Sequence, residues 1–123
     1  GKIISKQKAL DKINTNLIKK MPNYVLQIRE NYEKMIVNTF IDAEVYGNIS
    51  RFLNHSCNPN LYFDIVRIEH FIPHVAFYAL RDITEGEELT FSYCDDNNKP
   101  DSFERSYKKC ECGAENCMKF LPS

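Results

Sequence analysis

Apolar residues recur every three or four positions between residues 5 and 20, which is the spacing of one helix face. These residues are Ala9, Leu10, Ile13, Leu17 and Ile18. Ser5 can cap the start of a helix, because its side-chain oxygen accepts a hydrogen bond from an early backbone N–H group. Pro22 disfavours helix in the residue before it. The pattern therefore predicts one helix over residues 5–20.

The rest of the chain contains short runs of β-branched and aromatic residues, which are typical of strands. Residues 24–28 and 35–40 are two such runs, and the polar segment between them predicts a hairpin. Further strands are predicted over residues 61–68, 75–80 and 89–93. We expect a mostly β chain with one helix near its N-terminus.

Composition is that of one globular domain, with 123 residues, 43% of them hydrophobic and 27% charged. No apolar run is long enough to span a membrane, and the start lacks the pattern of a signal peptide. The net charge of -1 gives no overall nucleic-acid footprint. We therefore expect neither a membrane nor a nucleic acid as a direct partner, and the sequence predicts no oligomeric state.

The charges are unevenly spread along the chain. Residues 1–20 hold six Lys against one Asp, and residues 82–104 hold eight Asp or Glu against one Lys. Both stretches are explained by a solvated surface. The alternative is that the acidic stretch helps to attract a basic peptide.

Five cysteines, an odd number without an export signal, disfavour a secreted disulfide framework and favour reduced thiols that bind zinc. Cys110, Cys112 and Cys117 form a Cys-x-Cys-x4-Cys group near the C-terminus. Structural zinc takes four tetrahedral ligands, so this triplet needs a fourth thiolate. Cys57 is the best candidate and Cys94 is the alternative.

His55 is close to Cys57 in the sequence and is another candidate for a metal ligand. Neighbouring side chains in an extended segment point to opposite sides. We therefore expect His55 and Cys57 not to face the same ion.

Three motifs in order resemble the signatures of SET-domain lysine methyltransferases. The first is Tyr-Gly-Asn-Ile-Ser-Arg-Phe-Leu-Asn-His-Ser-Cys-Asn-Pro-Asn at residues 46–60, and the second is Glu-Glu-Leu-Thr-Phe-Ser-Tyr at residues 87–93. The third is the cysteine triplet with the residues up to Leu121, which is similar to the family's post-SET zinc segment. Within the family, the chain looks most like the SUV39-type histone-lysine N-methyltransferases.

The resemblance implies a SET-domain fold of short strands, in which residues 54–57 pass under a C-terminal loop to form a pseudoknot. It implies a SET domain over residues 1–94, a linker over 95–109 and a post-SET zinc segment over 110–123. The last segment is too short for a core of its own and needs metal to hold a shape. We therefore expect a small zinc-stapled tail.

The resemblance also implies roles for individual residues. Tyr93 matches the family's catalytic tyrosine, and Phe91 matches the position that limits how many methyl groups the lysine accepts. The residues expected to contact S-adenosylmethionine are Arg51, Phe52, Asn54, His55 and Leu121. Zinc is expected to bind Cys57, Cys110, Cys112 and Cys117. Taken without the motifs, two aromatic residues at i and i+2 on a strand would simply fill a core.

The implied activity is methyl transfer from S-adenosylmethionine to a lysine amine of a basic histone-tail peptide, in nuclear chromatin. The amine must lose its proton to attack, and the ordinary pKa of lysine is about 10.4. A narrow apolar channel disfavours the ammonium form. Because Phe91 has no hydroxyl, it leaves room for a bulkier amine, and we expect di- or trimethylation.

The start of the chain departs from the family's pattern. SET domains begin with strands that carry a Gly-x-Gly-type cofactor loop, followed by a Tyr-x-Gly-Glu-type element. Here residues 1–4 resemble only the end of the second element, with Lys2 in place of Glu. We expect the first strands and one wall of the cofactor pocket to be missing. The alternative to an active enzyme is therefore a catalytically inactive SET remnant that serves as a zinc-stapled protein-binding module.

Overall fold

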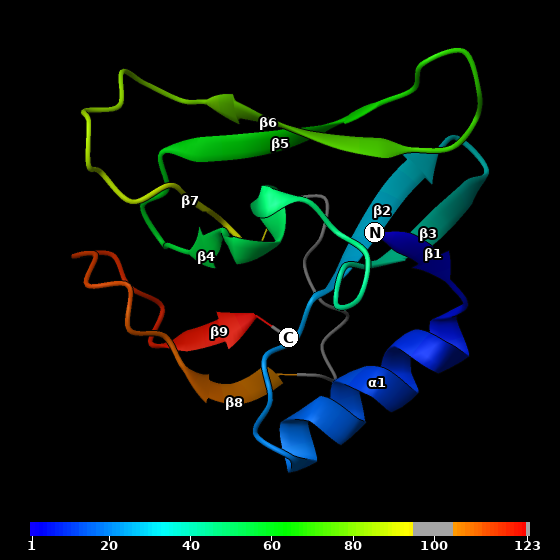
Figure 1. The fold of residues 1–123 in the computed structure, drawn as a ribbon, viewed down its shortest axis with the longest axis horizontal. Helices are drawn as coiled ribbons and strands as arrows, with labels where there is room; N and C mark the ends of the chain where they lie inside the picture. The colour runs from blue at the N-terminus through cyan, green and yellow to red at the C-terminus, as the bar shows by residue number, and fades with distance from the viewer. Residues whose placement is uncertain (95–104, 123) are drawn as a thin grey trace. The chain divides into compact units, whose positions relative to one another are not determined.

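The computed structural model describes residues 1–94 and 105–122 (Figure 1). They form two compact units, of which the first comprises Gly1–Phe52 and the second comprises the described residues from Leu53 onward. Within the described residues, no helix has both the length and the apolar character needed to cross a membrane.

The first unit combines one helix with a three-stranded antiparallel sheet of strand order β1-β3-β2 (Figure 1). Its elements are β1 (Lys2–Ile4), α1 (Lys6–Ile18), β2 (Val25–Tyr32), β3 (Met35–Asp42) and the 3-10 helix η1 (Ile49–Phe52). The predicted helix is confirmed, and Ser5 caps it by accepting a hydrogen bond from the backbone N–H of Lys8 at 3.4 Å. The helix ends before Pro22 because Lys20 adopts a left-handed conformation, with φ of 54°.

The predicted hairpin of the first unit is confirmed, and its strands are longer than the apolar runs. Strands β2 and β3 pair up to Tyr32 and Met35, which leaves only residues 33–34 for the turn. Polar Glu30 and Asn31 pair with Val37 and Ile36, because the backbone ladder continues whatever side chains the strands carry. Ile28 and Phe40 are buried, and Ile28 has no exposed surface.

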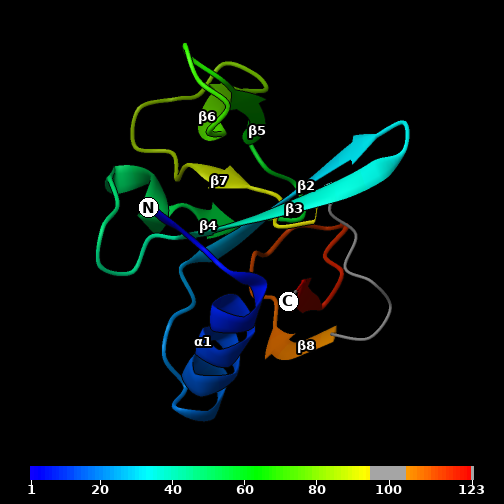
Figure 2. The same ribbon diagram turned by 90° about the vertical axis from the view of Figure 1, so that its right-hand side faces the viewer.

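The second unit contains a four-stranded mixed sheet of strand order β4-β7-β5-β6. Its strands are β4 (Asn54–His55), β5 (Leu61–Val66), β6 (His74–Ala79) and β7 (Thr90–Phe91). Strands β5 and β6 form an antiparallel hairpin, while β7 runs parallel to both β4 and β5. Figure 2 shows β7 between β4 and β5. The three predicted strands are confirmed, and the last is reduced to two residues.

The second unit also contains a two-stranded antiparallel sheet of β8 (Arg105–Lys109) and β9 (Phe120–Pro122). Most of the linker predicted over residues 95–109 lies outside the described residues. The described part of it, 105–109, is strand β8 rather than irregular chain. Its backbone groups pair with β9, which follows the cysteine triplet.

Candidate functional site

Tyr93 is anchored at both of its ends to the segment before Cys57. Its backbone N–H donates a hydrogen bond to Nδ1 of His55 at 3.0 Å, and its hydroxyl donates to the carbonyl oxygen of Leu53 at 3.0 Å. The rings of His55 and Tyr93 lie 5.2 Å apart. Burial raises the pKa of the Tyr93 hydroxyl, so the group stays protonated, yet 40% of the residue is exposed. The site therefore presents a neutral hydroxyl and a partly open aromatic ring.

Phe91 lies on the same side of the chain as Tyr93, as residues two apart in an extended segment do. The two ring centroids are 4.9 Å apart. Phe91 also packs edge-on against Phe77, at 5.0 Å, and Phe63, at 6.1 Å, and it is buried. Phe91 is thus part of the core of the second unit and at the same time a direct neighbour of Tyr93.

Asn54 and His55 form β4, which runs alongside β7. Their Cα partners there are Thr90 and Phe91. The pairing continues beyond the strand, since the backbone N–H of Ser56 donates to the carbonyl oxygen of Phe91 at 3.1 Å. The side-chain amide of Asn54 donates to Glu88 Oε1 at 2.8 Å. The structure therefore brings together four of the residues predicted from the motifs, which are Asn54, His55, Phe91 and Tyr93.

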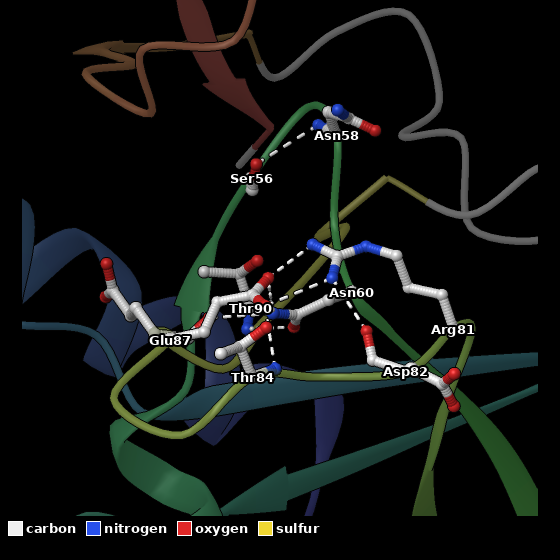
Figure 3. Close-up of polar contacts among 9 residues, drawn as sticks. Ser56, Asn58, Asn60, Arg81, Asp82, Thr84, Glu87 and Thr90 are labelled. Carbon is white, nitrogen blue, oxygen red and sulfur yellow. Dashed lines mark hydrogen bonds and ion pairs between the residues drawn. The ribbon is translucent and has the colours of Figure 1, made fainter.

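Asn60 is a residue of this region for which the sequence predicted no role (Figure 3). Its side chain is 2% exposed, and its amide donates to Glu87 Oε1 at 3.0 Å and to the carbonyl oxygen of Glu88 at 2.8 Å. Its Oδ1 accepts a hydrogen bond from the backbone N–H of Thr90 at 2.9 Å. Both polar atoms of the carboxamide are thus hydrogen-bonded, and these bonds hold the backbone at the start of β7 in place.

Glu87 is held in its ionised form around the same point. The Arg81 guanidinium pairs with both of its carboxylate oxygens, and the backbone N–H of Thr84 donates to Oε2 at 3.2 Å (Figure 3). The Arg81 side chain, followed by that of Asn60, lowers the pKa of Glu87 to about 2. The loop before β7 therefore carries a fixed carboxylate that accepts several hydrogen bonds at neutral pH.

Four cysteines form a second cluster in the same unit. The Sγ atoms of Cys57, Cys110, Cys112 and Cys117 all lie within 4.8 Å of one another. Cys94, the alternative fourth ligand, does not belong to this group in the described part of the chain. Four thiolates at such separations are the donor set of a structural zinc site. The cluster joins residue 57 to the segment between β8 and β9.

Backbone N–H groups prepare some of these sulfurs for a cation. The backbone N–H groups of Cys57 and Ala114 lower the pKa of Cys112 to about 6, and the first of them lies 3.5 Å from the sulfur. Burial has the opposite effect on Cys110, whose pKa it raises to about 12. The N–H of Met118 donates to the Cys57 sulfur at 3.4 Å. Without a cation, the buried Cys110 would keep its proton, so zinc would have to displace it.

His55 lies on the same side of the chain as Cys57, so the two side chains do not point to opposite sides as the sequence suggested. Its Nε2 is 3.3 Å from Cys57 Sγ. The two residues are separated by Ser56, and side chains two apart in an extended segment share a side. His55 is nevertheless outside the group of four sulfurs.

Arg51 and Phe52 belong to the first unit, where they form the end of η1. The Arg51 guanidinium stacks 4.3 Å over the ring of Tyr24 and 5.1 Å from that of Phe52. Its buried Nε has no hydrogen-bond partner within residues 1–94 and 105–122. Leu121 lies half-buried in β9 of the second unit. Arg51 and Phe52 therefore belong to a different unit from Tyr93, whereas Leu121 belongs to the same unit.

Comparison with known proteins places this geometry in a family. Residues 1–94 match the SET domain model. SETMAR of Rattus norvegicus, a histone-lysine N-methyltransferase, is 41% identical, over 82% of this chain and 35% of that protein. Su(var)3-9 of Drosophila melanogaster, also a histone-lysine N-methyltransferase, is 46% identical, over 66% of this chain and 14% of that protein.

Solved structures agree with these sequence matches. The methyltransferase domain of human SETMAR superposes with a TM-score of 0.80 at 34% identity, covering 99% of this chain and 46% of that one. Arabidopsis thaliana SUVH6 in complex with SAM gives a TM-score of 0.74 at 30% identity, covering 98% of this chain and 26% of that one. The chain spans less than half the length of each of these relatives. The predicted SET fold and the resemblance to SUV39-type enzymes are confirmed, and the chain belongs to the SET-domain family.

Proposed function

We propose that this chain is part of a protein-lysine methyltransferase that transfers methyl groups from S-adenosylmethionine to a basic histone-tail peptide. The observation that carries the proposal is the fixed position of Tyr93, which contacts both Phe91 and His55. Two SET-domain relatives of known structure are in complex with SAM or SAH, and the relatives SETMAR and Su(var)3-9 are histone-lysine methyltransferases. That these relatives are methyltransferases does not favour the alternative of a catalytically inactive SET remnant.

In this proposal Tyr93 orients the lysine amine. Its hydroxyl is neutral and already directed at the carbonyl oxygen of Leu53, so that a lone pair of the hydroxyl stays available to an incoming amine. The partly exposed ring and the carbonyl oxygen both favour a nearby cation such as a methylated ammonium. The cofactor, when bound, supplies an electrophilic methyl group. The rate gain that these residues provide comes mainly from orientation.

We assign cofactor contacts to Asn54, His55 and Leu121 in the second unit. Asn54 and His55 contribute backbone groups at the edge of the mixed sheet, because β4 is its outermost strand on that side. The cofactor roles of Arg51 and Phe52 rest on the sequence resemblance. Within the described residues, the buried Nε of Arg51 has no hydrogen-bond partner, which is consistent with an N–H group that donates to a bound ligand.

The four cysteines are proposed to bind one structural zinc ion, with Cys57, Cys110, Cys112 and Cys117 as its ligands. The observation behind this is the 4.8 Å limit on their sulfur separations. With zinc bound, residues 110–123 would be held as a post-SET segment next to residue 57. Residues 1–94 would then form the SET domain proper, and the family implies a nuclear, chromatin-associated location.

Phe91 is proposed to set the number of methyl groups. Its ring lies against that of Tyr93 and carries no hydroxyl, so the space beside Tyr93 accepts a methylated amine. Phe91→Tyr should shift the product towards monomethyl-lysine, because a second hydroxyl can hydrogen-bond the amine and restrict its rotation. An unchanged ratio of methylation states, measured by mass spectrometry, would contradict this role.

The enzymatic proposal is tested with the zinc-loaded chain, S-adenosylmethionine and core histones, with methyl-lysine detected by mass spectrometry. Tyr93→Phe is the matched variant, since it removes one oxygen and leaves the ring. We expect methylation by the wild-type chain and a loss of about 100-fold in the variant, the size of effect that a misplaced reacting group can have. Cofactor binding without methyl transfer would instead support the zinc-stapled binding module, and no binding in calorimetry would contradict the assigned cofactor contacts.

A further inference from the structure

The imidazole of His55 touches both the cysteine cluster and Tyr93. His55 is 7% exposed, and each of its ring nitrogens has one partner. Nδ1 accepts the backbone N–H of Tyr93 at 3.0 Å, and Nε2 is 3.3 Å from Cys57 Sγ. Buried polar atoms are costly when unpaired, so both contacts contribute to keeping the ring in place.

The first of these contacts fixes the tautomer of the ring. A backbone N–H can only donate, so Nδ1 must be free of a proton to accept from Tyr93. In the neutral ring the proton is then on Nε2, and it points at the sulfur of Cys57.

The same reasoning separates His55 from the metal ligands. A neutral imidazole that bound zinc through Nε2 would carry its proton on Nδ1. That proton would face the N–H of Tyr93 at 3.0 Å, with two donors opposed. His55 therefore donates to a ligand of the cluster and does not itself bind the ion.

We propose that His55 is a positioning residue that couples metal binding at the four cysteines to the position of Tyr93. The proposal rests on the proposed function, in which the cysteines hold zinc and Tyr93 is catalytic. A zinc-bound Cys57 is a thiolate fixed in one position, and it accepts the Nε2–H bond that sets the ring angle. The ring angle in turn directs Nδ1 at Tyr93. A metal-free Cys57 thiol rotates about its own bonds and gives the ring a weaker acceptor.

The coupling reaches Tyr93 at its backbone and its ring. The imidazole bonds the Tyr93 N–H and packs 5.2 Å from the phenol ring, tilted by 58°. The hydroxyl of Tyr93 bonds to Leu53, two residues before His55. A shift of the imidazole therefore moves the backbone of Tyr93. Because the hydroxyl of Tyr93 stays hydrogen-bonded to Leu53, the phenol ring must rotate.

The test uses nuclear magnetic resonance of the whole 123-residue chain with ¹⁵N-labelled histidine, without cofactor or peptide. We expect His55 to show a protonated Nε2 and a proton-free Nδ1, and the amide signal of Tyr93 to shift when a chelator removes zinc. His70 and His74 are exposed and serve as internal controls. A proton on Nδ1 of His55, or a Tyr93 amide that does not respond to zinc, would overturn the coupling without any variant.

Two matched substitutions separate the two contacts. In His55→Asn the amide oxygen can replace Nδ1 but nothing reaches Cys57, and in His55→Gln the amide nitrogen can reach Cys57 but nothing replaces Nδ1. We expect zinc affinity to fall by about 10–100-fold in His55→Asn, the usual effect of removing a hydrogen bond to a metal ligand. His55→Gln should stay within a few-fold of wild type, and neither variant should transmit zinc binding to the Tyr93 amide.

The outcomes also separate this inference from the proposed function. A Tyr93 amide that still follows zinc loading equally in both variants would reject the positioning role of His55. If the wild-type amide follows zinc loading but no histone methylation is found, the coupling stands and the enzymatic assignment fails. In the reverse case, with methylation that survives zinc removal unchanged in kcat, the coupling is rejected and the enzymatic assignment stands.

Discussion

The two units of this chain are stabilised by different kinds of interaction. In the first unit the buried residues are mostly apolar, with Ala9, Ile28 and Phe40 at 5% exposure or less. In the second unit the buried residues include the polar His55, Ser56 and Asn60. The first unit thus depends mainly on apolar burial at a regular antiparallel sheet. The second combines buried apolar residues such as Leu61 and Phe91 with buried polar side chains and the four-cysteine cluster.

The difference is greatest at the candidate site, where the strands are short. Strands β2 and β3 pair over eight residues each, and their ladder satisfies its own backbone groups. Strands β4 and β7 pair over only two residues each. So short a pairing is not stable by itself, and side chains such as Asn54 and Asn60 supply the missing bonds. The candidate site lies in the unit whose geometry depends on specific polar contacts.

Removal of zinc should give the largest contrast between the units. Structural zinc sites contribute apparent binding free energies of about 10–16 kcal/mol. With a chelator, or with Cys57→Ser, we expect the amide signals of β8 and β9 to collapse while those of Ile28 and Phe40 keep their dispersion. Metal content is measured by atomic absorption. Cys94→Ser is the matched control and should retain zinc, and the opposite result for these two variants would assign the fourth ligand to Cys94.

Truncation of the apolar core should have its effect in the first unit whether or not zinc is present. Ile28 has no exposed surface, and Ile28→Ala should lower the free energy of unfolding by about 2–5 kcal/mol. Ile36, on the paired strand, is 52% exposed, and Ile36→Ala should change it by no more than about 0.5 kcal/mol. Urea unfolding followed by the amide signals of β2 and β3 provides the measurement. A loss at Ile28 that depends on zinc would contradict the comparison.

Removal of a buried polar side chain should matter most in the second unit. Asn60→Ala leaves the N–H of Thr90 and the carbonyl oxygen of Glu88 without their partner, and each such buried group costs about 1–3 kcal/mol. Asn58 is exposed and bonds Ser56 through its backbone N–H, so Asn58→Ala should be nearly neutral. Urea unfolding followed by the signals of β5 and β7 compares the two. Equal effects of both changes would show that the Asn60 side chain does not fix β7.

The same difference explains what could be predicted from the sequence. The helix and the hairpins follow from the period of apolar residues, which reflects burial on one face. Asn60 belongs to no periodic pattern of apolar residues. It differs from an exposed Asn in its hydrogen-bond partners, which lie 27 to 30 positions further along the chain. Its signals in the sequence were its place at the end of the motif at residues 46–60 and its position directly before an apolar strand.

The candidate site was predictable where chemistry limits the choices. Three clustered cysteines require a fourth ligand because zinc has four positions, and the motif around residue 57 suggested which one. The link through His55 was missed because the ring was placed on the wrong side of the chain. Its tautomer depends on the N–H of Tyr93, 38 positions away, which only a folded structure brings near.

The pH dependence of zinc binding should reflect the different pKa values of the cysteine thiols. Thiols must lose their protons to bind zinc, so affinity rises with pH. Because the pKa of Cys110 is about 12, the rise should continue across the accessible pH range. Because that of Cys112 is about 6, this residue has little proton left to release at pH 8. Calorimetry in buffers of different ionisation enthalpy should give fewer than four protons per zinc at pH 8, and a full four would contradict the lowered pKa of Cys112.

The smallest expected effect concerns Glu87 and tests whether a partly solvated ion pair contributes to the second unit. Its pKa is lowered from 4.5 to about 2 in the folded chain, so the stability it contributes is present above pH 4.5 and lost as the pH falls towards about 2. Glu87→Gln should therefore flatten the fall in stability across this window, measured by urea unfolding of β5 and β7 at several pH values. Arg81→Ala should flatten it less, because Asn60 and the N–H of Thr84 still bond the carboxylate. The exposed Glu85 provides the matched control, because Glu85→Gln removes the same charge. If Glu85→Gln flattened the profile as much as Glu87→Gln, overall charge rather than the fixed carboxylate of Glu87 would govern the acid response of the second unit.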